Sequence, residues 1–191
     1  MELPSEFNLQ YDKDEINLAC ERIGVDISVW AKEVRAQTSK DVIAIPVLRG
    51  GVFFFADVVR EVSCSLEVAP VRTWAYEQTL NQPKLKDEVQ IDQSGVDPEG
   101  RSVLFLDDIC DSGKTLTALK ERFLTLGANE VRSAVLIKRE LSDETFNPDY
   151  VGFNYNGPEW FVGYGMEDNE RWRNLSSIYI IEGTGGHTDV G

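Results

Sequence analysis

Apolar residues recur at intervals of three and four near the N-terminus, which is the spacing of one face of an α-helix. This stripe consists of Ile16, Ala19, Cys20, Ile23, Ile27, Trp30 and Val34. A helix with a single apolar stripe packs that face against a core and exposes the other. The pattern therefore predicts a first helix, from Ile16 to Val34, with one buried face.

Short uninterrupted apolar runs between polar turns predict strands that are buried on both faces. The clearest are VIAIPVL, from Val42 to Leu48, and VLFL, from Val103 to Leu106. Further strands are expected from Leu66 to Tyr76, Val131 to Ile137, Tyr150 to Phe153, Trp160 to Tyr164 and Ile178 to Ile181. Helical patterns separate several of these runs. The alternation predicts an α/β fold in which a mostly parallel central sheet is flanked by helices and ligands bind beyond the carboxyl ends of the strands.

Two more helices are expected. One runs from Gly51 to Val62, and the other follows the sequence DDICDSGKT. The buried face of the latter is expected to consist of Leu116, Leu119, Phe123 and Leu126. Gly127 stands where a left-handed residue is needed to end this helix.

The stretch from Glu77 to Arg101 shows no sustained periodicity. Its breaker residues are Pro83, Gly95, Pro98 and Gly100. So long a connection inside a compact domain is usually a functional lid or a disordered excursion. Because the pattern contains no internal repeat or second core, we expect a single domain over residues 1–182 and a flexible tail over residues 183–191.

Acidic residues outnumber basic ones. The chain has 33 Asp and Glu against 19 Lys and Arg among 191 residues, which gives a formal net charge of −14. Such a surface repels phosphate backbones and anionic lipids, which argues against general nucleic-acid or membrane binding. The three cysteines share no close spacing, and the N-terminus lacks the basic and apolar regions of a secretory signal. No apolar run reaches the ~20 residues of a membrane span. We therefore expect a cytoplasmic protein.

The segment after the strand Val103–Leu106 combines carboxylates with the start of a helix. Asp107 and Asp108 follow the strand, and residues 111–115 read DSGKT. Unpaired backbone N–H groups and the dipole at a helix start favour an anion, and phosphate is the natural ligand. The alternative is that Asp111 or Ser112 only caps the helix and the acidic pair is solvated. A structural turn, however, does not require two adjacent carboxylates.

The GKT sequence invites comparison with the nucleotide-binding P-loop. That loop needs a glycine five residues before Gly113, where this chain has Asp108. Carboxylates at this point would repel a polyphosphate. We therefore expect them to face hydroxyl groups or a metal ion, while the backbone of residues 111–115 holds a single phosphate. A ligand with vicinal hydroxyls close to one phosphate is a ribose 5-phosphate.

The stretch VLFLDDICDSGKTL resembles the phosphoribosyl pyrophosphate (PRPP) signature of the type I phosphoribosyltransferases. Three further segments narrow the resemblance to the hypoxanthine-guanine phosphoribosyltransferases. VLRGGVFFFADVVR is similar to their first loop and following helix, SAVLIKR to their purine-side strand, and NPDYVGFNYNGPEWFVGYGMEDNERWRNL to their hood and final strand. The resemblance covers about residues 41–182 and implies a small hood formed by N-terminal residues and about residues 150–175.

The resemblance implies an enzyme of purine salvage. Such an enzyme transfers the 5-phosphoribosyl group from PRPP to hypoxanthine or guanine, giving IMP or GMP and pyrophosphate, with Mg²⁺ as cofactor. Members of the family form homodimers or homotetramers. Two alternatives stay open: a regulator with the same fold that senses PRPP or a nucleotide without turnover, and a phosphoribosyltransferase for another base such as xanthine.

The resemblance also implies roles on the PRPP side. Asp107 and Asp108 would hold the ribose hydroxyls, directly or through Mg²⁺, and Asp111 would be the general acid or base near N7 of the purine. The 5-phosphate would contact Asp111, Ser112, Gly113, Lys114 and Thr115. The pyrophosphate would contact Arg49, Gly50, Tyr76 and Arg173. The family's cis peptide would fall between Leu48 and Arg49.

On the purine side, Lys138 would donate to the 6-oxo group, Trp160 would stack on the base, and the backbone of Phe161 would read its edge. From the residues alone, Lys138 could be an ordinary strand-end lysine, but it follows SAVLI without a polar break, which favours a pocket position. Trp160 could equally be a core residue. The only histidine, His187, lies in the expected tail. Acid–base work must then fall to a carboxylate.

Three positions depart from the family pattern. Ala75-Tyr76 stands where the family has Ser-Tyr, Arg49 where it has Lys, and Glu167 where it has Asp. The implied metal-contacting residues are Asp107, Asp108 and Glu167. Because a glutamate is one methylene longer than an aspartate, we expect looser metal binding there, unless Asp168 supplies the carboxylate.

Overall fold

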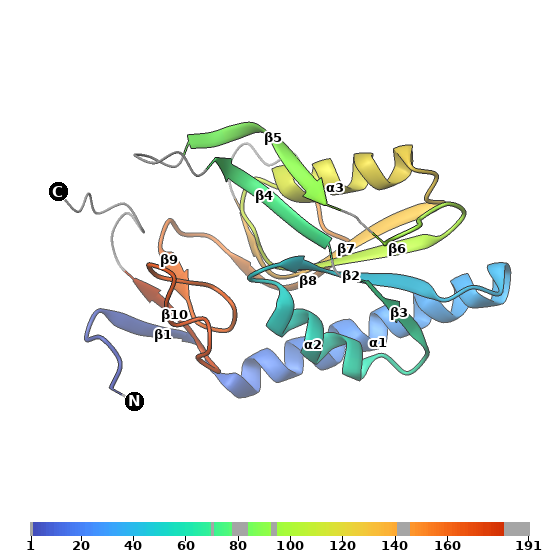
Figure 1. The fold of residues 1–191 in the computed structure, drawn as a ribbon. Helices are drawn as coiled ribbons and strands as arrows, with labels where there is room; N and C mark the ends of the chain where they lie inside the picture. The colour runs from blue at the N-terminus through green and yellow to red at the C-terminus, as the bar shows by residue number, and fades with distance from the viewer. Residues whose placement is uncertain (1, 70, 78–83, 93–94, 141–145, 182–191) are drawn as a thin grey trace.

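The structure is a computed structural model of the chain, and it describes residues 2–69, 71–77, 84–92, 95–140 and 146–181 (Figure 1). A sheet lies between helices, and a second, smaller sheet lies to one side (Figure 1). No helix in these ranges is both long enough and apolar enough to cross a membrane. The expected tail over residues 183–191 falls outside the described residues.

Helix α1 runs from Lys13 to Thr38 and begins at a capping box. The Asp12 carboxylate accepts hydrogen bonds from the backbone N–H groups of Asp14 and Glu15, both at 2.9 Å, and the Glu15 side chain accepts one from the Asp12 N–H. These bonds satisfy N–H groups that have no partner inside the helix. All seven residues of the predicted stripe are buried, so the prediction of a helix with one buried face is confirmed.

The central sheet has the strand order β5-β4-β2-β6-β7-β8, and β3 pairs with the same edge of β2 as β4. Its strands are β2 (Val42–Leu48), β3 (Leu66–Val68), β4 (Val71–Glu77), β5 (Lys84–Asp92), β6 (Ser102–Cys110), β7 (Glu130–Arg139) and β8 (Tyr150–Tyr155). All pairings are parallel except that of β4 with β5. The predicted α/β fold with a mostly parallel sheet is confirmed.

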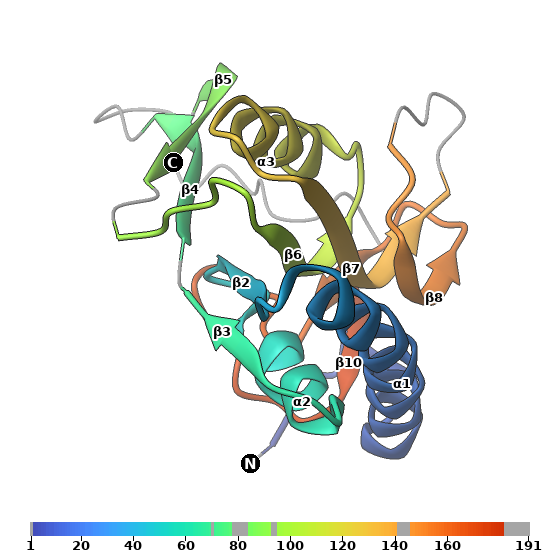
Figure 2. The ribbon, with the colours of Figure 1, turned by 90° about the vertical axis from the view of Figure 1, so that its right-hand side faces the viewer.

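Side chains of β2 and β6 alternate between two hydrophobic cores. Ala44 and Leu104 face α1 and α2 (Val52–Glu61), whereas Ile45 and Phe105 face α3 (Lys114–Thr125). Figure 2 shows α1 and α2 on one face of the sheet and α3 on the other. Both strands are therefore buried on two sides, which is why their sequences are continuous apolar runs.

The small sheet, as we call the second sheet, consists of β1 (Phe7–Tyr11), β9 (Trp160–Val162) and β10 (Ile178–Ile181). Its strands are antiparallel, and β1 pairs with β10 at the other end of the chain. The small sheet lies beyond the carboxyl end of β2 (Figure 1). Residues 150–155, which the resemblance assigned to a hood, form β8 of the central sheet instead.

Several predicted limits differ from the structure. The strand predicted from Leu66 to Tyr76 is two strands, because β3 pairs with residues 42–44 of β2 and β4 with residues 47–48. The connection from Glu77 to Arg101 contains β5, which pairs with β4. The strand predicted to end at Tyr164 ends at Val162.

The third helix is close to its prediction. Leu116, Leu119 and Phe123 are buried, whereas Leu126 is only half-buried because α3 ends at Thr125. Gly127 has a φ of 90°, so it ends the helix as predicted.

Candidate active site

Asp107 and Asp108 lie inside β6, not in the turn after it as predicted. The parallel ladder with β7 continues past Leu106, with Asp107 opposite Val135 and Cys110 opposite Lys138. The two aspartates are buried, each with 9% of its surface exposed. Polar residue types predicted the end of the strand too early, because hydrogen bonding to β7 keeps the backbone extended through the acidic pair.

Burial raises the pKa of both carboxyl groups. Desolvation is the main cause, and the Asp108 charge raises the pKa of Asp107 further, to well above its ordinary value. Hydrogen bonds and the Arg173 charge oppose the rise at Asp108. Asp107 Oδ1 accepts from the Asp108 N–H and Asp108 Oδ1 from the Ile109 N–H, both at 3.0 Å. A buried acidic pair of this kind favours a cation or hydroxyl donors beside it.

The N-terminus of α3 lies next to this pair. Its first cap residue, Gly113, has a φ of 71° and no side chain that could cap the helix, and the first turn holds no acidic residue. A hollow of about 50 Å³ is lined by Asp107, Ile109, Cys110, Ser112, Gly113, Lys114, Thr115 and Leu116. A Cβ at Gly113 would lie 2.3 Å from the Cβ of Phe146, so only glycine fits. The helix start and its dipole thus favour an anion in this hollow.

The loop after β2 packs directly on the acidic pair. The Leu48–Arg49 peptide is cis, as the resemblance implied. A Cβ at Gly50 would lie 2.0 Å from Asp108 Oδ2, and a Cβ at Gly165 would lie 2.1 Å from the Gly50 carbonyl oxygen. Two glycines therefore allow the acidic strand, this loop and the segment after β9 to be in contact.

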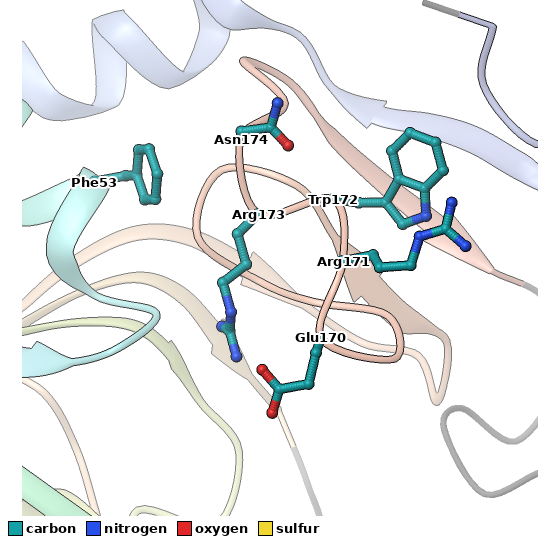
Figure 3. A pocket seen from close by; sticks show the side chains of 6 residues that line it. All are labelled: Phe53, Glu170, Arg171, Trp172, Arg173 and Asn174. Carbon is teal, nitrogen blue, oxygen red and sulfur yellow. The ribbon is translucent and has the colours of Figure 1, made fainter.

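Arg173 connects the segment after β9 to the same place. Its Nη1 donates to the Gly165 carbonyl at 2.6 Å, and its Nη2 lies 2.9 Å from Glu167 Oε2. Arg49 Nη2 makes an exposed ion pair with Glu170 Oε1 at 2.8 Å. A hollow of about 520 Å³ is lined by Phe53, Glu170, Arg171, Trp172, Arg173 and Asn174. Figure 3 shows Arg173 and Glu170 pointing to one side of this segment and Arg171 and Trp172 to another.

The end of β7 carries a second group of polar side chains. Lys138 Nζ donates to Asn147 Oδ1 at 2.9 Å. Arg139 Nε donates to Asp111 Oδ1 at 2.6 Å.

Trp160 and Phe161, the aromatic pair on β9, contact the segment after β9 and the end of β7 respectively. Trp160 is 39% exposed, and its Nε1 donates to the Glu167 carbonyl at 2.7 Å. Phe161 is buried, and its ring meets that of Tyr155 edge-on with centroids 4.7 Å apart. The exposed indole leaves an aromatic surface on which a planar ligand could stack.

Comparison with known proteins decides the family. The model of the phosphoribosyl transferase domain matches residues 18–169. The hypoxanthine-guanine phosphoribosyltransferase of Lactococcus lactis is 31% identical over 144 residues, which cover 75% of this chain and 76% of that protein.

The chain belongs to the phosphoribosyltransferase family.

Other relatives agree with this assignment. The hypoxanthine-guanine phosphoribosyltransferase of Bacillus subtilis is 29% identical over 178 residues, 91% of this phosphoribosyltransferase and 96% of that protein. The crystal structure of a hypoxanthine phosphoribosyltransferase from Staphylococcus aureus has the same fold, with a TM-score of 0.78 and 22% identity over 92% of this chain and 91% of that one. The fold that the resemblance implied is therefore confirmed.

The structure brings most of the predicted site residues of this phosphoribosyltransferase together at the carboxyl ends of the inner strands of the central sheet. Asp107, Asp108, Gly50, Arg173 and the start of α3 lie together. Glu167 is held by Arg173 instead of joining the acidic pair, and within the described residues no three His, Cys, Asp or Glu side chains are grouped as metal ligands. The side chain of Tyr76 lies outside the part that the structure describes.

Three polar residues near the site were not predicted from the sequence: Arg139, Asn147 and Glu170. Arg139 directly follows Lys138 at the end of an apolar strand, so the signal that selected the lysine applied equally to its neighbour. Glu170 and Asn147 carry no such signal, because only the fold shows that Glu170 pairs with Arg49 and that Asn147 pairs with Lys138.

Proposed function

We propose that this phosphoribosyltransferase transfers the 5-phosphoribosyl group of PRPP to a 6-oxopurine, hypoxanthine or guanine, and releases pyrophosphate. The observation that carries the proposal is the buried pair Asp107–Asp108 beside the N-terminus of α3. This arrangement offers acceptors for ribose hydroxyls a short distance from a site for one phosphate. The names of the relatives support a purine as the acceptor.

The PRPP side of the site would use the acidic pair on β6, the start of α3, the loop after β2, and Arg173. Asp107 and Asp108 accept hydrogen bonds from the ribose hydroxyls, and their negative charge stabilises the positive charge that develops on the ribose as pyrophosphate leaves. The 5-phosphate binds to the backbone N–H groups of residues 111–115. Pyrophosphate is bound by Arg49, Gly50, Tyr76 and Arg173.

The acidic pair suits a magnesium ion. Mg²⁺ prefers oxygen ligands and is usually held by one or two carboxylates together with substrate phosphates and water, so a complete protein cage is not required. Asp107 and Asp108 would hold it on the ribose side, and Glu167 would contact a second ion only after leaving Arg173. When bound, the metal neutralises charge on the leaving pyrophosphate.

The purine side of the site would use the polar residues at the end of β7, the aromatic pair on β9, and Asp111. Lys138 donates to the 6-oxo group, which distinguishes these bases from a 6-amino purine, while Trp160 stacks on the ring and the Phe161 backbone contacts its edge. Asp111 exchanges the proton at N7 as the new bond to the ribose forms. The Lys138 ammonium has three N–H donors, so it can donate to the base while it keeps its bond to Asn147.

A pyrophosphate-release assay with a panel of bases tests this function. We expect turnover with hypoxanthine and guanine, dependence on Mg²⁺, and little or no turnover with adenine or uracil. Pyrophosphate release with none of these bases, together with tight PRPP binding, would instead identify a sensor. A preference for xanthine would correct the substrate but keep the reaction.

Three further expectations stay predictions. A homodimer or homotetramer would be measured by sedimentation equilibrium. A cytoplasmic location would be measured by cell fractionation. A lid over Ala75–Arg101 would be tested by limited proteolysis with and without Mg²⁺, PRPP and a base analogue, since bound ligands would then protect the segment from cleavage.

A further inference from the structure

Arg139, the last residue of β7, is a buried cation near the candidate site. Its side chain is 9% exposed. Its Nε donates to Asp111 Oδ1 at 2.6 Å, its Nη1 to the Gly157 carbonyl, and its Nη2 to the Glu159 carbonyl at 3.0 Å. All three nitrogens of the guanidinium thus have an acceptor.

Two aromatic rings also hold this guanidinium. Its carbon lies 4.9 Å from the ring centroid of Phe161 and 5.6 Å from that of Tyr155. A cation over an aromatic face is attracted by it, and the flat guanidinium stacks there better than an ammonium does. The position of Arg139 is therefore fixed by the backbone of residues 157–159 and by two rings.

Among the described residues, Arg139 is the side chain that holds the Asp111 carboxylate. It lies between the end of β6 and the start of α3, and its side chain is 51% exposed. The ion pair with Arg139 engages Oδ1, and Oδ2 takes no part in that contact. Arg139 thus holds one oxygen of the carboxylate at a fixed place and leaves the other for a ligand.

The same guanidinium touches both halves of the purine side. It binds the carboxylate that would exchange the N7 proton, and it binds the two carbonyls and the ring that flank Trp160. Only a planar fork with several N–H donors can contact all of these groups at once. A lysine has the charge but not this geometry.

We propose that Arg139 is a positioning residue that sets the Asp111 carboxylate relative to the purine-contacting residues 157–161. The inference rests on the proposed function, in which Asp111 exchanges a proton with the base. It assigns Arg139 no contact with substrate. Because misplacement of a reacting group by 1 Å can cost about 10²-fold in rate, loss of this arginine should lower kcat.

Steady-state kinetics of Arg139→Gln tests the proposal. We expect kcat to fall about 10- to 100-fold, the KM for the purine to rise, and the KM for PRPP to change less than about twofold. In an Asp111→Asn background, assayed at higher enzyme concentration, the same substitution should change kcat less than about threefold. The effects of two substitutions on kcat are not additive when both act through the same carboxylate.

Arg132→Gln is the matched control. Arg132 lies on the same strand, β7, near the end opposite to Arg139. It also combines an ion pair, with Glu130 at 2.7 Å, a bond to the Tyr150 hydroxyl at 3.0 Å, and an aromatic ring, that of Trp30, whose centroid lies 4.5 Å from the guanidinium carbon. We expect the loss of Arg132 to lower stability but not kcat.

The results separate the possible failures. Arg139 is only structural, and the inference is wrong, if the wild-type protein releases pyrophosphate and Arg139→Gln has the kcat of Arg132→Gln. The inference is also wrong if Arg139→Gln lowers kcat by the same factor in the wild-type and the Asp111→Asn backgrounds. If Arg139→Gln does not fold, Arg139→Lys replaces it: an unchanged kcat overturns the role of the fork, and a lowered kcat supports it. An inactive wild-type protein contradicts the proposed function itself.

Discussion

The segment from Asp107 to Thr115 and the segment from Gly163 to Arg173 meet at one site, but different kinds of structure hold them. The first is a strand, a short turn and a helix in direct succession, and its shape follows from the ladder with β7 and from the start of α3. Its functional groups are neighbours in the sequence. Such a segment can be recognised from its letters alone.

The second segment consists of tight turns. Positive φ angles occur at Gly163, Tyr164, Gly165, Asn169, Glu170 and Trp172. Four of these residues are not glycine, and such conformations persist only where surrounding contacts enforce them. The Tyr164 hydroxyl donates to Asp57 on α2 at 2.5 Å, and Arg173 holds the Gly165 carbonyl. The turns of this segment are therefore held by individual side-chain contacts, one of them with α2, whereas the first segment takes its backbone shape from a regular strand and helix.

The comparison predicts that a change in the first segment strongly lowers the turnover rate without unfolding the protein. Asp111→Asn should lower kcat by about 10² to 10⁴, because a positioned acid–base group contributes that much. Pyrophosphate release measures the loss, and stabilisation of the variant by PRPP against heat shows that binding is kept. Turnover close to wild type would remove Asp111 from the mechanism.

A change in the second segment should instead affect both stability and PRPP binding. Gly165→Ala forces a residue with a φ of 102° to accept a Cβ only 2.1 Å from the Gly50 carbonyl oxygen. We expect a loss of about 2–4 kcal/mol in the free energy of unfolding, measured with urea, and a raised KM for PRPP.

Gly95→Ala is the control for this substitution. Gly95 has a φ of 90°, but a Cβ there has no neighbour within 4 Å. Gly95→Ala should lower the free energy of unfolding by about 1 kcal/mol, from backbone strain alone. Equal losses at the two positions would mean that the close approach of Gly165 to Gly50 contributes nothing.

Removing one hydroxyl should give a smaller effect. Burial raises the pKa of Tyr164, so this hydroxyl is protonated at neutral pH and donates to Asp57. Tyr164→Phe should cost about 1–2 kcal/mol and raise the KM for PRPP.

Tyr150→Phe tests whether that effect is local. The Tyr150 hydroxyl accepts a bond from Arg132 at 3.0 Å, within the central sheet. The two variants should lose similar stability, but Tyr150→Phe should leave the KM unchanged. A raised KM in both would show that lowered stability, not the second segment, is the cause.

Thiol alkylation gives a measurement that leaves turnover aside. Cys64 is half-buried, whereas Cys20 and Cys110 are buried. Burial raises the pKa of Cys20 to about 11, so at pH 8 only about one molecule in a thousand carries the thiolate there. Iodoacetamide should modify Cys64 first, and Cys20 should become reactive only near pH 11 or after unfolding. The Cys20 Sγ lies 3.6 Å from the Tyr164 hydroxyl, and rapid labelling of Cys20 at pH 8 would show that this contact opens readily.

Helices and inner strands could be predicted because their periodicity reports burial directly. Strand β5 was missed although Leu85, Val89 and Ile91 alternate with polar residues, since Asp87 interrupts the alternation. Strand β1 was missed because five residues with an alternating pattern form a strand only beside a partner. That partner, β10, lies at the far end of the chain.

The site divides in the same way. Asp107, Asp108 and Asp111 were predicted because a strand and a helix start frame them in the sequence. Arg139 was not, because its importance lies in contacts with Asp111 and with the backbone of Gly157 and Glu159, which only the fold brings together. Glu167 was assigned to a metal from its place in a motif, whereas in the structure it pairs with Arg173.

The pairing of β1 with β10 also fixes the order in which a newly made chain can be completed. Residues 7–11 leave the ribosome before the strands of the central sheet, whereas their partners, residues 178–181, follow those strands. The central sheet can form while β1 has no strand to pair with. The small sheet closes only after residues 178–181 have been made, so a chain that stops before them holds its acidic pair on β6 but not the complete site.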